Sequence, residues 1–130
     1  MKKRILLIED DLMIADIYST VFVKNGGYDV KNFTNGKDVL EWKDKIKREE
    51  REIPDLILLD LILPDTDGLD LLNIIQKEEV FNNIPVFVVT NYTSRELENM
   101  ASKLKIEKYI NKAKLLPREL LRMVKERLNG

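Results

Sequence analysis

The chain has 130 residues, a length that predicts one domain around one hydrophobic core. Its hydrophobic share of 44% and charged share of 35% are typical of a soluble globular protein, and its formal net charge of -1 gives no general attraction to nucleic acid or anionic membranes. Cysteine and histidine are both absent, which excludes disulfides, thiolate and imidazole metal ligands, and any phosphohistidine carried by this chain.

Short apolar runs rich in β-branched residues alternate with helical periodicity five times along the chain. The predicted strands lie near residues 4–8, 28–32, 55–60, 84–89 and 106–111. Apolar residues recur at helical spacing between the first two strands, namely Ile14, Ile17, Tyr18, Val21 and Phe22. They predict a first helix, which the Asn25-Gly26-Gly27 sequence would end.

Four further helices are predicted downstream. Their apolar positions place them near residues 39–46, 69–75, 97–104 and 117–128. The charged run from Lys43 to Glu52 is interpreted as solvated surface. Asp67 is the expected N-cap of the third helix, and Pro117 suits the first turn of the fifth.

Five strand-helix units in this length predict an α/β fold, with residues 1–130 forming a single (βα)5 domain. We expect a doubly wound, parallel five-stranded sheet with helices on both faces and right-handed crossovers. The expected strand order is 2-1-3-4-5, which is flavodoxin-like.

Acidic side chains end two of the predicted strands. Glu9 and Asp10 follow the first apolar run, and Asp60 follows the third. In the expected strand order these two strands are neighbours, and parallel strands end at the same edge of the sheet, so the three carboxylates should share one pocket. Like charges repel unless a cation lies among them, and hard oxygen ligands suit Mg²⁺. Asp11, one residue further on, is interpreted as a first-turn acid of the first helix.

The next two strand ends add a hydroxyl and an ammonium to the same edge. Thr90 ends the fourth predicted strand and Lys112 follows the fifth. Either residue alone has an ordinary explanation, as a strand residue or a surface lysine, and only their joint register is informative. A carboxylate nucleophile, a divalent cation, a lysine and a hydroxyl are together the groups needed to capture a phosphoryl group.

Several separated segments resemble the receiver domain of two-component response regulators over essentially the whole chain. The segments are Ile5-Leu6-Leu7-Ile8-Glu9-Asp10-Asp11 and Leu58-Leu59-Asp60-Leu61-Ile62-Leu63-Pro64-Asp65-Thr66-Asp67-Gly68, with Thr90, Tyr109 and Lys112 in register. By this resemblance Asp60 accepts a phosphoryl group. Mg²⁺ would be bound directly by Asp10, Asp60 and the main-chain carbonyl of Ile62, and through water by Glu9.

The resemblance also implies a switch. Thr90 would bind the phosphoryl oxygens, and Tyr109 would pack into the vacated space. The face formed by the fourth helix, fifth strand and fifth helix would then pass the signal to an effector or to a second copy in a phosphorylation-dependent homodimer. The donor would be a phosphohistidine on a sensor kinase or phosphotransfer protein. We expect a cytoplasmic signalling phosphoacceptor, not an enzyme acting on other substrates, with no direct binding to nucleic acid or membrane.

The sequence departs from the family pattern after the candidate lysine. Ala113 stands where the family usually has a proline in a cis peptide, so we expect a trans bond and an altered loop. Lys114 is a rival for the role of Lys112, although Tyr109 three residues before Lys112 favours the earlier lysine. The bulk of Asn91, Ile62 and Tyr92 leads to the hypothesis of slow aspartyl phosphate hydrolysis, because water would be excluded.

Two other functions remain as alternatives. A receiver-like interaction module would work without phosphorylation, but the complete set of site residues argues against it. A stand-alone phosphatase would need a substrate pocket or cap that is not evident in this length. The Asp65-Thr66-Asp67-Gly68 sequence does not fit a calcium-binding EF-hand, because Leu63 and Ile74 would occupy ligand positions, and it is interpreted as a turn into the third helix.

Overall fold

A computed structural model of the protein describes residues 2–49, 52–91 and 94–129, in which five strands alternate with five helices. The strands are Arg4–Ile8 (β1), Asp29–Phe33 (β2), Leu56–Leu59 (β3), Val86–Thr90 (β4) and Lys108–Asn111 (β5). The helices are Leu12–Lys24 (α1), Gly36–Ile46 (α2), Gly68–Lys77 (α3), Arg95–Ala101 (α4) and Pro117–Asn129 (α5). Every predicted element is present in the predicted order, and its ends differ by only a few residues.

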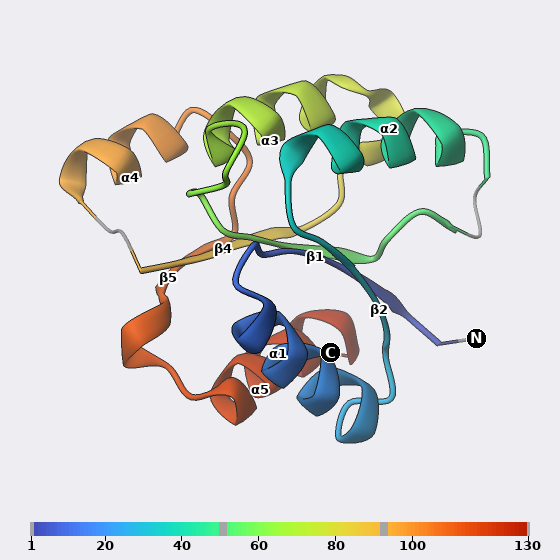
Figure 1. The fold of residues 1–130 in the computed structure, drawn as a ribbon, viewed down its shortest axis with the longest axis vertical. Helices are drawn as coiled ribbons and strands as arrows, with labels where there is room; N and C mark the ends of the chain where they lie inside the picture. The colour runs from blue at the N-terminus through green and yellow to red at the C-terminus, as the bar shows by residue number, and fades with distance from the viewer. Residues whose placement is uncertain (1, 50–51, 92–93, 130) are drawn as a thin grey trace.

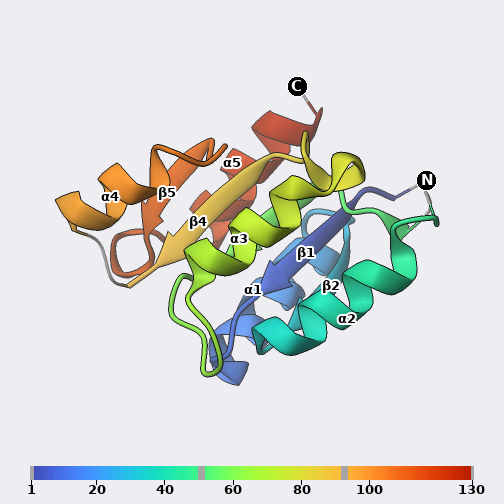
Figure 2. The ribbon, with the colours of Figure 1, turned by 90° about the horizontal axis from the view of Figure 1, so that it is seen from above.

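The strands form one parallel sheet in the order β2-β1-β3-β4-β5, as predicted. Figure 1 shows α2, α3 and α4 on one face of this sheet and α1 and α5 on the other. Ile8 pairs with Leu59 in the register of β1 and β3, so the next residues of the two strands leave the sheet side by side. Seen from above in Figure 2, the visible strand arrows point toward the same edge.

The sheet separates two buried apolar clusters. Alternate residues of β1 belong to different clusters, with Leu6 and Ile8 facing α2 and α3 while Ile5 and Leu7 face α1 and α5. Because helices cover both faces, every residue of β3 and β4 is buried, which explains their uninterrupted apolar sequences. No helix in the described part of the chain is both long and apolar enough to cross a membrane.

Side chains and glycines define the helix ends near the site. Asp67 is the N-cap of α3, as predicted, and accepts a hydrogen bond from Leu69 N at 2.7 Å. Asp11 is the N-cap of α1 and accepts hydrogen bonds from the amides of Met13 and Ile14. It was expected inside the first turn, but it lies one residue before the helix begins. Gly27 takes a φ of 71° just after α1.

Three details of the helices contradict the sequence-based expectations. Lys43 was expected to be solvated, yet its side chain is buried, with Nζ 2.8 Å from Glu78 Oε1 and 2.9 Å from Asp44 Oδ1, because α2 packs against the end of α3. Ile17 was counted in the apolar face of α1 but is 44% exposed. The fourth helix ends at Ala101, before the predicted position 104. Positions 50 and 51 of the charged run lie outside the described residues.

Candidate functional site

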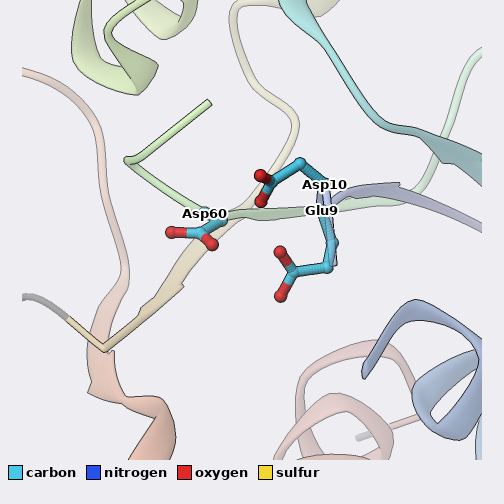
Figure 3. A group of neighbouring side chains, drawn as sticks. All are labelled: Glu9, Asp10 and Asp60. Carbon is cyan, nitrogen blue, oxygen red and sulfur yellow. The ribbon is translucent and has the colours of Figure 1, made fainter. Parts of the chain in front are cut away.

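The three predicted acids meet at the carboxyl ends of β1 and β3. Figure 3 shows the side chains of Glu9, Asp10 and Asp60 directed toward a common space. One carboxylate oxygen of each residue lies within 4.8 Å of one oxygen of each of the other two. Glu9 and Asp60 are only 2% and 8% exposed, whereas Asp10 is open to solvent. The parallel register of the two strands therefore brings three oxygen ligands together at the mouth of a pocket.

Lys112 provides a positive charge within this cluster. It lies in a short 3₁₀ turn, Lys112–Lys114, directly after β5. Its Nζ donates hydrogen bonds to Glu9 Oε1 and, at 3.0 Å, to Asp60 Oδ2. Lys114, at the end of the same turn, is exposed. The structure thus places Lys112, and not Lys114, against the acids.

The backbone at Ala113 has the trans geometry that was expected. The peptide bond between Lys112 and Ala113 is trans. The Asn111 side chain accepts a hydrogen bond from the Ala113 amide at 2.9 Å, which caps the turn that carries the lysine. Asn111 therefore helps to hold Lys112 at the acids.

Burial and crowding shift the ionisation of the cluster. Burial raises the pKa of Glu9 to about 7, although the hydrogen bond and charge of Lys112 act in the opposite direction, while the nearby Asp60 charge adds to the increase. Burial disfavours the Lys112 ammonium, but its hydrogen bonds to Glu9 and Asp60 outweigh this effect and raise its pKa. One ammonium among three acids leaves excess negative charge, which suits a divalent cation with hard oxygen ligands.

The acids open into a cavity of about 230 Å³. Its lining consists of Glu9, Asp10, Asp11, Ile14, Asp60, Ile62, Thr90, Asn91 and Lys112. The Ile62 amide donates to Asp60 Oδ1 at 3.2 Å, so the loop after β3 helps to orient the Asp60 carboxylate. The exposed Ile62 side chain stands at the entrance. Of the three residues expected to restrict water, Ile62 and Asn91 line the cavity, and Tyr92 lies outside the described residues.

The two expected switch residues occupy different places. Thr90 is fully buried at the end of β4 and is one of the residues that line the cavity. Tyr109 is partly buried on β5, opposite Val88 in the parallel register, and packs against the apolar cluster under α3 and α4. Tyr109 does not belong to the cavity lining. An effect of the pocket on Tyr109 would therefore have to pass through β4 or the segment that follows it.

Two residues that support the site were not identified from the sequence. Asn32 Nδ2 on β2 donates to the carbonyls of Leu7 at 3.0 Å and Glu9 at 3.4 Å, which secures the end of β1. Asp65 had been assigned to a turn, but its carboxylate accepts bonds from the first amides of α2. Both contacts join segments more than twenty residues apart, so no local pattern announces them.

An apolar surface adjoins the acid pocket. Leu12 and Met13, at the start of α1, are 71% and 75% exposed. A second cavity next to them shares the lining residues Ile14, Asn91 and Lys112 with the acid pocket. The rest of its lining is largely apolar and comes from Ile17, Tyr18, Leu115 and Pro117. Exposed apolar side chains beside a charged site are typical of a protein-binding surface.

Comparisons with known proteins agree with this geometry. The chain is 29% identical over 118 residues to the polar-differentiation response regulator DivK of Brucella anthropi, covering 91% of this chain and 90% of DivK. It is 30% identical over 128 residues to the DNA-binding response regulator MtrA of Mycobacterium tuberculosis, covering 98% of this chain but only 51% of MtrA. The chain therefore spans about half the length of that relative.

A solved structure shows the same architecture. A CheY-like response regulator receiver domain protein from Methanospirillum hungatei aligns with a TM-score of 0.83 and 32% sequence identity, over 99% of this chain and 95% of that one. The family model described as the response regulator receiver domain matches residues 5–125. Because this family model covers nearly the whole chain, the chain belongs to the response regulator receiver family of two-component systems.

Proposed function

We propose that this receiver domain takes a phosphoryl group from a phosphohistidine of a partner kinase or phosphotransfer protein onto Asp60. The observation that carries the proposal is the arrangement around this carboxylate. Asp60 is buried at the base of an open cavity, in contact with the Lys112 ammonium at 3.0 Å and next to two further acids. A buried carboxylate placed among groups that bind anions and cations is an activated nucleophile.

The residues present fit Mg²⁺, since three carboxylates offer hard oxygen ligands within 4.8 Å of one another. Asp10, Asp60 and the Ile62 carbonyl would hold the ion directly, and Glu9 through water. When bound, the ion would supply positive charge that offsets the repulsion between Asp60 and an anionic donor. The ion pairs of Lys112 with Glu9 and Asp60 support the proposal that this cluster attracts positive charge.

The chemistry at Asp60 is an in-line displacement. A carboxylate oxygen forms a bond to phosphorus while the bond from phosphorus to the donor imidazole nitrogen breaks, and the electron pair of that bond stays on the nitrogen. Lys112 pairs with the phosphoryl oxygens and stabilises their charge. The product is an aspartyl phosphate. Water later hydrolyses it to the free Asp60 carboxylate and inorganic phosphate. The domain thus promotes only its own phosphorylation and dephosphorylation, and acts as a signalling phosphoacceptor.

The signal would leave through the α4-β5-α5 face. Thr90 lines the cavity, and its hydroxyl would donate to a phosphoryl oxygen and draw the segment after β4 inward. Tyr109 on the adjacent strand would then repack, because β4 and β5 are in direct register from Phe87 to Thr90. The altered face would bind a downstream effector or a second copy of the domain.

The donor protein must contact the surface around the pocket entrance to bring its imidazole to Asp60. The exposed Leu12 and Met13 and the cavity along α1 provide an apolar contact surface at the pocket entrance. We assign this surface to the phosphodonor, and we propose that the domain works together with its kinase in the cytoplasm. The alternative of an interaction module without phosphorylation gains nothing from the structure, because each group needed for phosphoryl capture lies at the pocket.

Intact-mass analysis after treatment with acetyl phosphate tests the proposal. The wild-type protein should gain one phosphoryl group with Mg²⁺ and none after chelation. Asp60→Asn should gain none under either condition. Asp55→Asn is the matched control, because Asp55 precedes β3 at its opposite end, where it accepts a bond from Arg4 N, and this variant should be labelled like the wild type. Labelling of Asp60→Asn, or no labelling of the wild type with Mg²⁺, would refute the proposal.

A further inference from the structure

We infer that Asp65 is a positioning residue of the magnesium site, an inference that rests on the function proposed above. By binding the start of α2, Asp65 holds the loop between β3 and α3 in place. This loop carries Ile62, whose carbonyl is an expected metal ligand and whose amide binds Asp60. The inference therefore makes α2, which contributes no ligand, part of the support of the site.

Both oxygens of Asp65 are used in this contact. Oδ1 accepts a hydrogen bond from Gly36 N at 2.8 Å, and Oδ2 accepts one from Lys37 N at 2.9 Å. The first amides of a helix have no partner within the helix and carry its positive dipole end, so they bind a carboxylate well. The same two hydrogen bonds lower the pKa of Asp65, which keeps it charged. Figure 2 shows the loop before α3 reaching the start of α2.

Capping of α2 does not by itself explain the contact. The helix has a local N-cap, Asn35, whose side chain accepts a bond from Asp38 N at 2.8 Å. Asp65 comes from 29 residues away and binds two other amides of the same turn. What it adds is a connection between two segments, not a replacement for a missing cap.

Packing reinforces this connection. A β-carbon at Gly36 would lie 2.4 Å from Thr66 Cγ2. A larger residue at Gly36 would force the Thr66 side chain to move, and the buried Gly36 is covered by this residue, which follows Asp65. The hydrogen bonds and the close approach therefore involve the same two short segments.

The other side of the loop is also fixed. Gly68 N donates to the Leu61 carbonyl at 2.8 Å, and Ile62 forms an antiparallel bridge with Asp67. Ile62 thus lies between two anchored points of the loop. On one side its amide is hydrogen-bonded to Asp60, and on the other side Asp65 attaches the loop to α2. Without Asp65 the loop would keep its link to α3 but would lose its attachment to α2, and the Ile62 carbonyl would be less well oriented.

Titration of Mg²⁺ against Asp65→Ala and Asp65→Asn tests the inference. Loss of a residue that orients a metal ligand commonly weakens metal binding about tenfold or more, so the Mg²⁺ dissociation constant of Asp65→Ala should rise about tenfold. Asp65→Asn keeps one acceptor oxygen but turns its NH2 group toward the second helix amide, so it should recover part of the affinity. If the charge of Asp65 merely attracted the cation, the two variants would bind Mg²⁺ equally weakly, and the inference would be wrong.

Asn35→Ala is the matched control, because it removes the other cap of α2 without touching the loop. It should lower the free energy of unfolding but leave the Mg²⁺ dissociation constant unchanged. A readout without metal is amide hydrogen exchange, which should become faster at Ile62 in Asp65→Ala and stay unchanged there in Asn35→Ala.

The outcomes separate the inference from the proposed function. Wild-type protein that binds no Mg²⁺ would refute the proposed function and, with it, the role of Asp65. Wild-type binding with an unchanged dissociation constant in Asp65→Ala, or with equal weakening in Asn35→Ala, would refute the inference alone. Unchanged exchange at Ile62 in Asp65→Ala would also count against it.

Discussion

Replacing Lys112 by methionine should destabilise the metal-free protein in a pH-dependent way. Methionine keeps most of the length of the side chain and removes its charge. In the wild type the buried ammonium contacts both Glu9 and Asp60. In Lys112→Met these two acids would face each other and Asp10 with no positive charge between them, so their repulsion would oppose folding.

The separation of the acids sets the size of this effect. At 4.8 Å, the upper limit of the spacing between these oxygens, two unit charges repel by about 0.9 kcal/mol in bulk water and by about 3.5 kcal/mol at an effective dielectric constant of about 20. Removal of one partner from a buried ion pair commonly costs about 3–5 kcal/mol. The pocket is open to solvent and Glu9 is able to take up a proton, so we expect a loss of about 1–3 kcal/mol at about pH 8.5.

The loss should become smaller at lower pH. In the wild type the pKa of Glu9 is raised from 4.5 to about 7, so the folded state binds the proton more tightly and stability falls as pH rises through this range. Without Lys112 the pKa of Glu9 should rise further. At about pH 5.5 Glu9 is protonated in both proteins, and only the contact of Lys112 with Asp60 is lost.

Urea denaturation at both pH values, with and without Mg²⁺, measures these differences. Saturating Mg²⁺ should reduce the loss at high pH, because it supplies the missing positive charge. Lys114→Met is the control, since Lys114 is an exposed neighbour in the same turn, and it should change stability by less than about 0.5 kcal/mol. The reasoning would be wrong if Lys112→Met were as stable as the wild type, or if its loss were the same at both pH values.

Three further predictions concern the metal, the phosphoryl lifetime and the core. Mg²⁺ affinity, measured by titration, should fall by up to about tenfold per pH unit below pH 7, because a proton on Glu9 competes with the metal, and Glu9→Gln should remove this dependence. Ile62→Ala and Asn91→Ala should each shorten the lifetime of the aspartyl phosphate several-fold by admitting water, and an unchanged decay of the phosphorylated mass would contradict this. Leu72→Ala, at a fully buried position of α3, should lower the free energy of unfolding by about 2–5 kcal/mol in urea denaturation, whereas Ile74→Ala, exposed on the same helix, should lower it much less.

Much of the fold and of the candidate site was predictable from local patterns. Apolar runs of strand length identified all five strands, and their alternation with helices predicted a parallel sheet, because parallel strands need crossover helices. Once the order of the sheet is known, residues that follow different strands must meet at one edge. Glu9, Asp60 and Lys112 are brought together for this reason, and their separation in the sequence is no obstacle to the prediction.

Contacts between helices and loops were not predictable in this way. The burial of Lys43 depends on the distance between α2 and the end of α3. The exposure of Ile17 depends on which part of α1 is covered by neighbouring elements. The same holds for Asp65, whose partners Gly36 and Lys37 follow a different strand. Nothing in the local sequence of any of these residues specifies the partner.

The sequence by itself determined the secondary structure, the parallel arrangement of the strands and the chemical groups that follow each strand, because hydrophobic periodicity and chain connectivity are local properties. The tertiary structure settled the strand order, placed Lys112, which the sequence already favoured over Lys114, against the acids, and joined the loop after β3 to α2 through Asp65. These choices depend on distances between side chains of packed elements, and such distances arise only when the whole chain has folded.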